Sequence, residues 1–424
     1  MQKYALNKVR RLDLLNEVKQ QFPEKKGAIV LFAHFEHEKQ RFLQESSFYY
    51  LTGVTESAAV LVISLDGATT LYMPNCLEER KKWLPCPIMV SDECAKKLEV
   101  DCVKYLGARC PGYQAYPYFE PPMYEALLAD LKIELGDDGT LFTLAPESPY
   151  AYAEQRGLLR RLQDLGLTKK VQDVSAIVAR MRRSKDMDEI EALYKAVEIT
   201  CLAQEAAAQA IGDGVAEAEV QASLEYMITG SRARIAFPSI VGSGANSTVL
   251  HYTENDGIMK EGDLVVVDIG AQYNHYCADL TRTYPVSGAF TARQKEVYNL
   301  VLKTQEYIAQ LAKPGMWLSN KDKPEQSLNH LAKKFLEQKG YADYFPHGIG
   351  HYLGLDVHDV GDYTEPLASG DVITIEPGIY IPEEQIGIRI EDNYWITKDG
   401  AICLSEQLPK DVTSIEQMVK KQFA

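Results

Sequence analysis

Leu264-Val265-Val266-Val267-Asp268-Ile269-Gly270 is a strongly apolar stretch that contains one aspartate, and Ala278-Asp279-Leu280-Thr281-Arg282-Thr283 carries a second. An acid inside a strongly apolar strand is unusual, because burying an unpaired carboxylate is costly. If the two stretches pair as a hairpin that turns at Tyr273-Asn274, Asp268 faces Asp279 with Cβ atoms roughly 5 Å apart. Opposed like charges destabilise a sheet unless a proton or a cation lies between them. The hairpin therefore indicates a shared proton or cation, and two unrelated surface or turn acids are the alternative.

Two further acids lie near the C-terminal end of the chain. Glu376 ends the apolar stretch 372–375 just before a Pro-Gly turn. In Arg389-Ile390-Glu391-Asp392, strand alternation places Arg389 and Glu391 on the same face. A buried Arg–Glu salt bridge is the alternative explanation for that pair.

The order of elements after residue 168 repeats. A capping box at Asp186 and Glu189 begins one helix, and residues 220–230 form a second. Strands are expected at 239–241, 264–269 and 278–283. Thr291 and Gln294 then cap a third helix, Pro324 opens a fourth, and strands follow at 372–375, 379–381 and 387–390. Two helices followed by strands, twice over, indicate an α+β domain with a pseudo-two-fold repeat.

Residues 1–168 are expected to form a smaller α/β domain, with strands at 28–32, 58–65, 69–73 and 141–144. Its helices are expected at 6–21, 122–132 and 150–165. The polar, non-periodic segment 166–170 places the boundary between domains 1–168 and 169–424.

A histidine-rich run lies between the aspartate hairpin and the two acids of the second half. Three of the eight histidines, His347, His351 and His358, fall within twelve residues, and interspersed glycines argue against a helix. Histidines near four acids favour a metal site, and a structural histidine cluster is the alternative. Four carboxylates and one imidazole suit Mn²⁺, Co²⁺, Fe²⁺ or a zinc pair. Four acids exceed the needs of one ion, so two ions ~3.5–4 Å apart are expected.

Composition narrows the classes of partner. The chain has 424 residues, 46% of them hydrophobic and 25% charged, and a net charge of −15. This charge disfavours nucleic acid and anionic membranes as partners, and the short basic run 180–185 is interpreted as a solvated face. No apolar run reaches the ~18 residues of a membrane helix, and the N-terminus has no signal-peptide core, so a cytoplasmic protein is expected. The eight cysteines, including the series from Cys76 to Cys110, lack CxxC spacing and are expected to be free thiols.

Six ordered motifs resemble the proline-specific metallopeptidases aminopeptidase P and Xaa-Pro dipeptidase (prolidase), which share the pita-bread fold with methionine aminopeptidase. The motifs are residues 240–246 with His251-Tyr252, 267–270, 279–283, 347–361 (HGIGHYLGLDVHDVG), 375–378 and 389–392. Residues 47–54 (SFYYLTGV) resemble the N-terminal domain of aminopeptidase P. The resemblance implies a C-terminal pita-bread domain after a smaller α/β domain.

The resemblance also implies roles for individual residues. The metal ligands would be Asp268, Asp279, His351, Glu376 and Glu391, with Glu376 also transferring protons. His251 and His358 would be catalytic histidines, and the substrate-binding residues would be His347, Arg389 and Tyr380. The cofactor would be two divalent ions, most favourably Mn²⁺, with Co²⁺, Zn²⁺ or Fe²⁺ as options.

The implied reaction is hydrolysis of the Xaa-Pro bond at the N-terminus of a peptide whose second residue is proline. The segment between Glu376 and Glu391 is shorter than in typical aminopeptidase P, which leaves a prolidase acting on dipeptides as the alternative. A metal-free pita-bread binding module and a methionine aminopeptidase fit less well. Relatives with this N-terminal domain suggest a homodimer or homotetramer.

Overall fold

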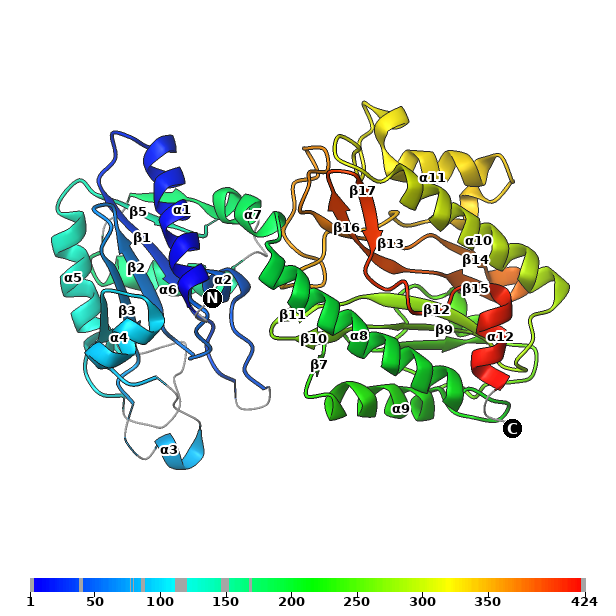
Figure 1. Ribbon diagram of the computed structural model, residues 1–424. Coiled ribbons are helices and arrows are strands. Elements are labelled where there is room, and N and C mark those ends of the chain that lie inside the picture. The colour runs from blue at the N-terminus through cyan, green and yellow to red at the C-terminus, as the bar shows by residue number, and fades with distance from the viewer. Residues whose placement is uncertain are drawn as a thin grey trace. The chain divides into compact units, whose positions relative to one another are not determined.

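The computed structural model describes residues 4–37, 41–76, 78, 80–84, 88–110, 120–145, 152–167 and 170–420. By internal contacts the chain divides into two compact units, Met1–Met181 and Arg182–Ala424, which are coloured blue to green and green to red in Figure 1. The boundary expected at residues 168 and 169 stays a prediction. Within the described residues, no helix combines the length and the apolar character that a membrane crossing requires.

The first unit contains a six-stranded sheet in the order β4-β3-β2-β1-β5-β6. Every residue of the central strand β1 is buried, and it pairs antiparallel with β2 and parallel with β5. Leucines of α5 and α6 pack with β1 in one apolar core. The strands are β1 (Gly27–Phe32), β2 (Val60–Ser64), β3 (Thr69–Met73), β4 (Cys102–Tyr105), β5 (Thr140–Thr143) and β6 (Val171–Asp173). The helices are α1 (Ala5–Gln21), α2 (Ser46–Thr52), α3 (Arg80–Trp83), α4 (Asp92–Leu98), η1 (Pro121–Tyr124), α5 (Glu125–Leu135) and α6 (Ala153–Asp164), and α7 (Ser175–Arg183) runs across the division between units.

The second unit is built from short antiparallel sheets with helices lying across them (Figure 1). Its first half contains α8 (Met187–Ala210), α9 (Glu217–Gly230), β7 (Arg234–Ile235), β8 (Ile240–Ser243), η2 (Gly244–Thr248), β9 (Leu264–Ile269), β10 (Ala271–Tyr273), β11 (Tyr276–Cys277) and β12 (Leu280–Pro285). Its second half contains α10 (Ala292–Leu311), η3 (Pro324–Gln326), α11 (Leu328–Glu337), η4 (Ala342–Tyr344), β13 (Val372–Ile375), β14 (Gly378–Ile381), η5 (Pro382–Glu384), β15 (Ile386–Arg389), β16 (Asp392–Thr397), β17 (Gly400–Cys403) and α12 (Val412–Lys420). The predicted α+β class is confirmed.

The two long helices begin as their capping residues predict. Asp186 and Glu189 form a capping box at the start of α8, and Thr291 and Gln294 form one at the start of α10. The expected helix start at Pro324 is wrong, because this proline opens only a 3₁₀ turn. The α-helix begins at Leu328, where the Ser327 side chain accepts from the His330 amide.

The register expected for the aspartate hairpin is wrong by two residues. Asp268 lies opposite Thr281, and Tyr273 lies opposite Tyr276. The turn is therefore at Asn274-His275, both with positive φ (47° and 72°), as a two-residue type I′ turn requires. Side chains alternate with period two, so a shift of two residues leaves Asp268 and Asp279 on one face as diagonal neighbours.

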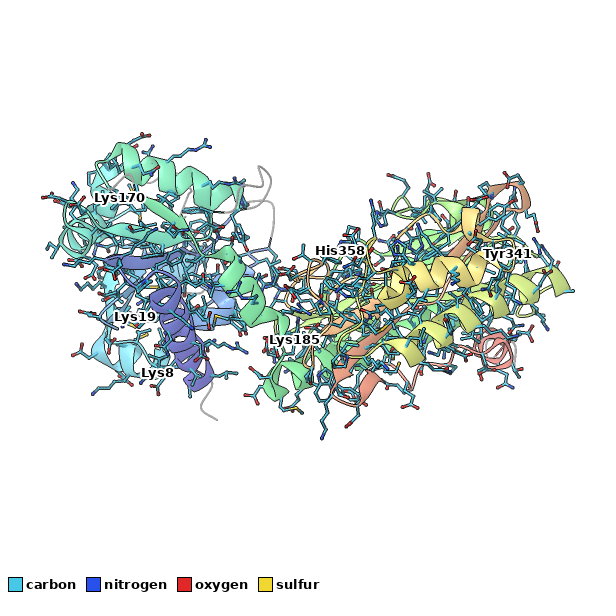
Figure 2. The ribbon with its side chains drawn as sticks, turned by 90° about the horizontal axis from the view of Figure 1, so that it is seen from above. Lys8, Lys19, Lys170, Lys185, Tyr341 and His358 are labelled. Atoms are coloured by element: carbon cyan, nitrogen blue, oxygen red, sulfur yellow. The ribbon has the colours of Figure 1, made fainter. Side chains whose placement is uncertain are left out.

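The basic run at 180–185 is not a solvated face, as the sequence had suggested. Arg182, Arg183 and Lys185 are buried. Arg183 donates to both carboxylate oxygens of Asp371 at 2.9 and 2.7 Å. Arg182 and Lys185 both pair with Asp359, the neighbour of His358. Lys185 and His358 are labelled in Figure 2. Because each buried charge has a partner, this segment ties the start of α8 to the loop that carries His358.

The cysteines at positions 76, 94, 102, 110, 201, 277 and 403 are free thiols in the described part of the chain. Cys86, within the expected Cys76–Cys110 series, lies outside the described residues.

Candidate metal centre

Four carboxylates meet where strands of the two halves end. Asp268 lies in β9, Asp279 precedes β12, Glu376 follows β13, and Glu391 lies between β15 and β16. Their backbones meet directly, because the Glu391 amide donates to the Thr281 carbonyl, 3.1 Å away, across the boundary between the halves. Asp268, Asp279 and Glu391 are 8%, 5% and 1% exposed. The alternative of unrelated surface acids is therefore wrong.

His351 stands among these acids. Its Nε2 lies 3.4 Å from Asp279 Oδ2 and 3.6 Å from Glu376 Oε1. Asp279, His351 and Glu391 each offer one ligand atom, and these three atoms lie within 4.8 Å of one another. Such spacing lets a single ion bind all three groups.

The ring of His351 is held in the tautomer that a metal ligand needs. Its Nδ1 lies 3.0 Å from the Tyr352 carbonyl, which can only accept, so Nδ1 carries the proton. The Nε2 lone pair then points at the acids. The backbone is fixed as well, since the His351 amide donates to Thr374 Oγ1 at 3.0 Å. Metal-bound histidines typically donate the N–H of their other ring nitrogen in this way, as Nδ1 of His351 does to the Tyr352 carbonyl.

Three buried carboxylate oxygens have no hydrogen-bond donor in the described part of the chain: Asp268 Oδ1, Asp279 Oδ1 and Glu391 Oε1. Buried polar atoms in folded proteins are nearly always paired, and an unpaired carboxylate oxygen is among the costliest exceptions. All three belong to the same cluster. The donor set of acids with one imidazole therefore fits divalent cations.

The acids also perturb one another. Burial and the charges of Asp268 and Glu376 raise the pKa of Asp279 well above its usual range. Burial and the charge of Asp279 do the same to the pKa of Glu391. The pKa of Glu376 is raised mainly by burial. Each of these three carboxyl groups therefore gives up its proton less readily than it would in water.

Arg389 connects the acids to the residues beside them. Its guanidinium donates to Asp268 Oδ2 at 2.7 Å, to the Tyr380 hydroxyl at 2.7 Å and to Thr281 Oγ1 at 3.2 Å. The Thr281 hydroxyl in turn donates to Glu391 Oε2 at 2.7 Å. The expected alternative of an Arg389–Glu391 salt bridge is wrong, because the guanidinium pairs with Asp268 in the other half.

The remaining histidines surround the cluster. The ring of His358 lies 4.2 Å from that of His351, centroid to centroid, and burial followed by the charge of His351 lowers its pKa. His347 Nε2 lies 3.0 Å from the Tyr380 hydroxyl, and burial lowers its pKa to about 4. His251 is exposed, and its charge lowers the pKa of both His347 and His358. His347 and His358 therefore lie near the acids, and His251 is close enough to these two histidines to affect their pKa values.

Three supporting residues were not identified from the sequence. Thr281 and Thr374 hold Glu391 and Glu376 by their hydroxyls. Asn393 accepts from the Asp279 amide at 3.1 Å and donates to its carbonyl at 2.6 Å. Thr281 could have been found, because it lies two residues after Asp279 and so shares its face. Thr374 and Asn393 carry no comparable signal.

Comparisons with known proteins identify the family of the chain. Residues 191–398 match metallopeptidase family M24, and residues 8–108 match the aminopeptidase P N-terminal domain. A Haemophilus influenzae Xaa-Pro aminopeptidase is 31% identical over 93% of each chain. A Pyrococcus horikoshii Xaa-Pro dipeptidase is 40% identical over 84% of this chain and 90% of its own. The structure of Escherichia coli aminopeptidase P with the inhibitor Pro-Leu superposes with a TM-score of 0.82 at 28% identity, over 99% of each chain.

Proposed function

The chain belongs to metallopeptidase family M24, and from this membership and the geometry of the centre we propose that it is a metal-dependent Xaa-Pro exopeptidase. It removes the first residue from peptides whose second residue is proline. The observation that carries the proposal is the buried carboxylate cluster with its three oxygens that lack a donor. The family match supports an enzyme, and the match along nearly the whole chain includes the N-terminal domain.

The residues that would hold the ions are Asp268, Asp279, His351, Glu376 and Glu391. Two divalent ions fit four acids better than one, and Mn²⁺ suits oxygen-rich sites, with Co²⁺, Zn²⁺ and Fe²⁺ as options. Bound there, the ions would supply Lewis acidity and lower the pKa of a water molecule towards neutrality.

Each protein group then has a definite task. Glu376, partly open to solvent, takes the proton of the attacking water and passes it to the proline nitrogen as the Xaa-Pro C–N bond breaks. That nitrogen cannot donate in the substrate, because an Xaa-Pro amide has no N–H. His358 and His251 donate N–H groups to the oxyanion that develops on the scissile carbonyl. His347, Tyr380 and Arg389 form a hydrogen-bonded row that binds and orients the peptide.

A dipeptidase is the second candidate. Two observations favour it: the 40% identity to the Pyrococcus horikoshii Xaa-Pro dipeptidase, and the short connection between Glu376 and Glu391 through the β14–β15 hairpin. The deciding assay compares Gly-Pro with an Xaa-Pro-Pro tripeptide in Mn²⁺ buffer. Preference for the tripeptide supports the aminopeptidase, and cleavage confined to Gly-Pro supports the dipeptidase. A chain that hydrolyses neither peptide contradicts both proposals.

The ligand assignment is tested by His351→Ala. Loss of the imidazole should leave the protein with fewer ions per chain and lower kcat/KM by at least ~10³-fold, the order seen when a group that stabilises transition-state charge is removed. Metal content by atomic spectroscopy and peptide hydrolysis are measured together. His330→Ala is the matched control, because His330 bonds to Ser327 on α11, outside the centre. Full metal content and activity in His351→Ala would refute the assignment.

We propose a homodimer or homotetramer, to be tested by light scattering of the purified chain. A cytoplasmic location and the absence of nucleic-acid or membrane partners stay predictions from the sequence.

A further inference from the structure

Two buried glutamines occupy corresponding places in the two halves of the second unit. Gln204 lies on α8 and Gln305 on α10, and both are 0% exposed. The Gln204 amide nitrogen donates to the carbonyls of Val267 and Leu280 at 3.0 and 2.8 Å. The Gln305 amide nitrogen donates to the carbonyls of Ile375 and Ile390 at 3.1 and 3.2 Å. Each glutamine therefore bridges two backbone segments of its own half.

These four carbonyls adjoin the candidate metal ligands. Those of Val267, Ile375 and Ile390 belong to the same planar peptide groups as the amides of Asp268, Glu376 and Glu391. That of Leu280 shares a peptide group with Thr281, whose hydroxyl donates to Glu391. Fixing a peptide plane fixes the next N–Cα bond and so restricts the directions in which the Cα–Cβ bond can leave the chain. Each glutamine thus restricts the starting direction of two side chains that face the centre.

The orientation of both carboxamides is determined by their partners. Backbone carbonyls only accept, so the NH₂ group must face them. On the other side, the Tyr284 hydroxyl donates to Gln204 Oε1 at 3.0 Å, and Lys410 Nζ donates to Gln305 Oε1 at 2.9 Å. With both N–H groups and the oxygen bonded, neither side chain can turn without leaving a buried polar group unpaired.

We propose that Gln204 and Gln305 are positioning residues for the metal centre, each holding the two strand ends of its half at the separation that the ions require. The inference rests on the proposed function. It assigns to α8 and α10 a role beyond covering the sheets. Each helix carries the glutamine whose hydrogen bonds set the distance between the two ligand-bearing segments of its half. Neither residue contacts substrate or metal.

The test uses Gln204→Met and Gln305→Met in the full chain, stripped of metal with EDTA. Methionine matches glutamine in length but donates no hydrogen bond. Calorimetric titration with Mn²⁺ should show affinity weakened about 10- to 100-fold, as expected when groups behind metal ligands are lost. The Co²⁺-loaded variants should show shifted visible absorption bands, a readout of ligand geometry that lower stability alone does not move.

Thr304→Val is the matched control. Thr304 is also fully buried and adjoins Gln305, but its hydroxyl donates only to the Leu300 carbonyl of its own helix. The control should lower thermal stability and leave the Mn²⁺ affinity and the Co²⁺ spectrum at parent values. If a methionine variant does not fold, the asparagine variant at the same position, whose amide is too short to reach both carbonyls, takes its place.

The outcomes separate the two proposals. Parent-like Mn²⁺ affinity and Co²⁺ spectra in folded glutamine variants would overturn the positioning role and leave the proposed function standing. Equal effects in Thr304→Val would also overturn it, because the change would then report packing. A parent chain that binds no Mn²⁺ and cleaves no Xaa-Pro peptide would defeat the proposed function itself.

Discussion

His347 ends a directional row of hydrogen bonds. Arg389 donates to the Tyr380 hydroxyl, that hydroxyl donates to His347 Nε2, and Nδ1 of the ring donates to the Gly348 carbonyl at 2.8 Å. A proton on Nε2 would force the Tyr380 hydroxyl to turn away. Burial, with the positive charges of Arg389 and His251, lowers the pKa of His347 to about 4, while the hydrogen bond to the Gly348 carbonyl and the charge of Asp268 act in the opposite direction. The neutral ring is therefore part of the folded arrangement.

We predict that His347 stays neutral down to about pH 5. In ¹H–¹³C spectra of histidine-labelled protein, its ring should titrate with a midpoint near 4, with the signal assigned through His347→Gln. Because the folded pKa lies below the unfolded value of about 6.5, the unfolded chain binds more protons in this window. The contribution of His347 to stability is thus complete above pH 6.5 and declines as the pH falls towards 4. A midpoint at 6 or higher would contradict the prediction.

At the scale of the element, the β10–β11 turn decides which residues of the aspartate hairpin meet. Asn274 and His275 both have positive φ, a conformation that costs a residue with a β-carbon roughly 1–2 kcal/mol. Asparagine tolerates it well, and glycine is the preferred second residue of a type I′ turn. The turn therefore sets the register of Asp268 and Asp279 although its second residue, His275, is less favourable there than glycine.

We predict that His275→Gly raises the free energy of unfolding by about 1 kcal/mol, because it removes this strain and produces the favoured Asn-Gly pair. Urea-induced unfolding of the full chain measures the change. His275→Ala retains the β-carbon and serves as the control that should show no gain. A glycine variant no more stable than the alanine variant would argue against strain at this turn.

The same turn illustrates how far the sequence leads. The apolar stretch around Asp268 and the capping box at Asp186 specify a strand and a helix locally, and both form as predicted. The register was missed because Asn274-His275 lacks the glycine that usually marks a type I′ turn. The acids and His351 were identifiable by motif, but Arg389 pairs with Asp268, 121 residues away, and only the fold decides such a partner. The burial of Arg182 was hidden for the same reason, since its acidic partner Asp359 is distant in sequence.

At the scale of the whole molecule, the candidate ligands all belong to Arg182–Ala424, and none belongs to Met1–Met181. We therefore predict that Mn²⁺ acts on one unfolding transition only. Because Mn²⁺ binds the native state, it should stabilise the second unit by about 2.7 kcal/mol at a concentration 100 times the Kd. In scanning calorimetry of the full chain, the unfolding temperature of the second unit should therefore rise. The first unit should unfold at an unchanged temperature, and EDTA should reverse the shift.

His351→Ala is the control for this experiment and should lose most of the Mn²⁺ response. An equal rise in both transitions would mean that the ions bind outside the proposed centre.

The buried basic segment at 182–185 has a consequence for where an active fragment could start. A chain that began at Asp186 would retain every candidate ligand and the whole of α8, yet it would lack the cations that neutralise Asp359 and Asp371, whose side chains are 1% and 0% exposed. The two buried carboxylates, left without their cationic partners, would then destabilise the loop next to His358. Dissection of this protein by proteolysis or gene truncation should therefore retain Arg182 if the excised portion is to keep the loop that carries His358 intact.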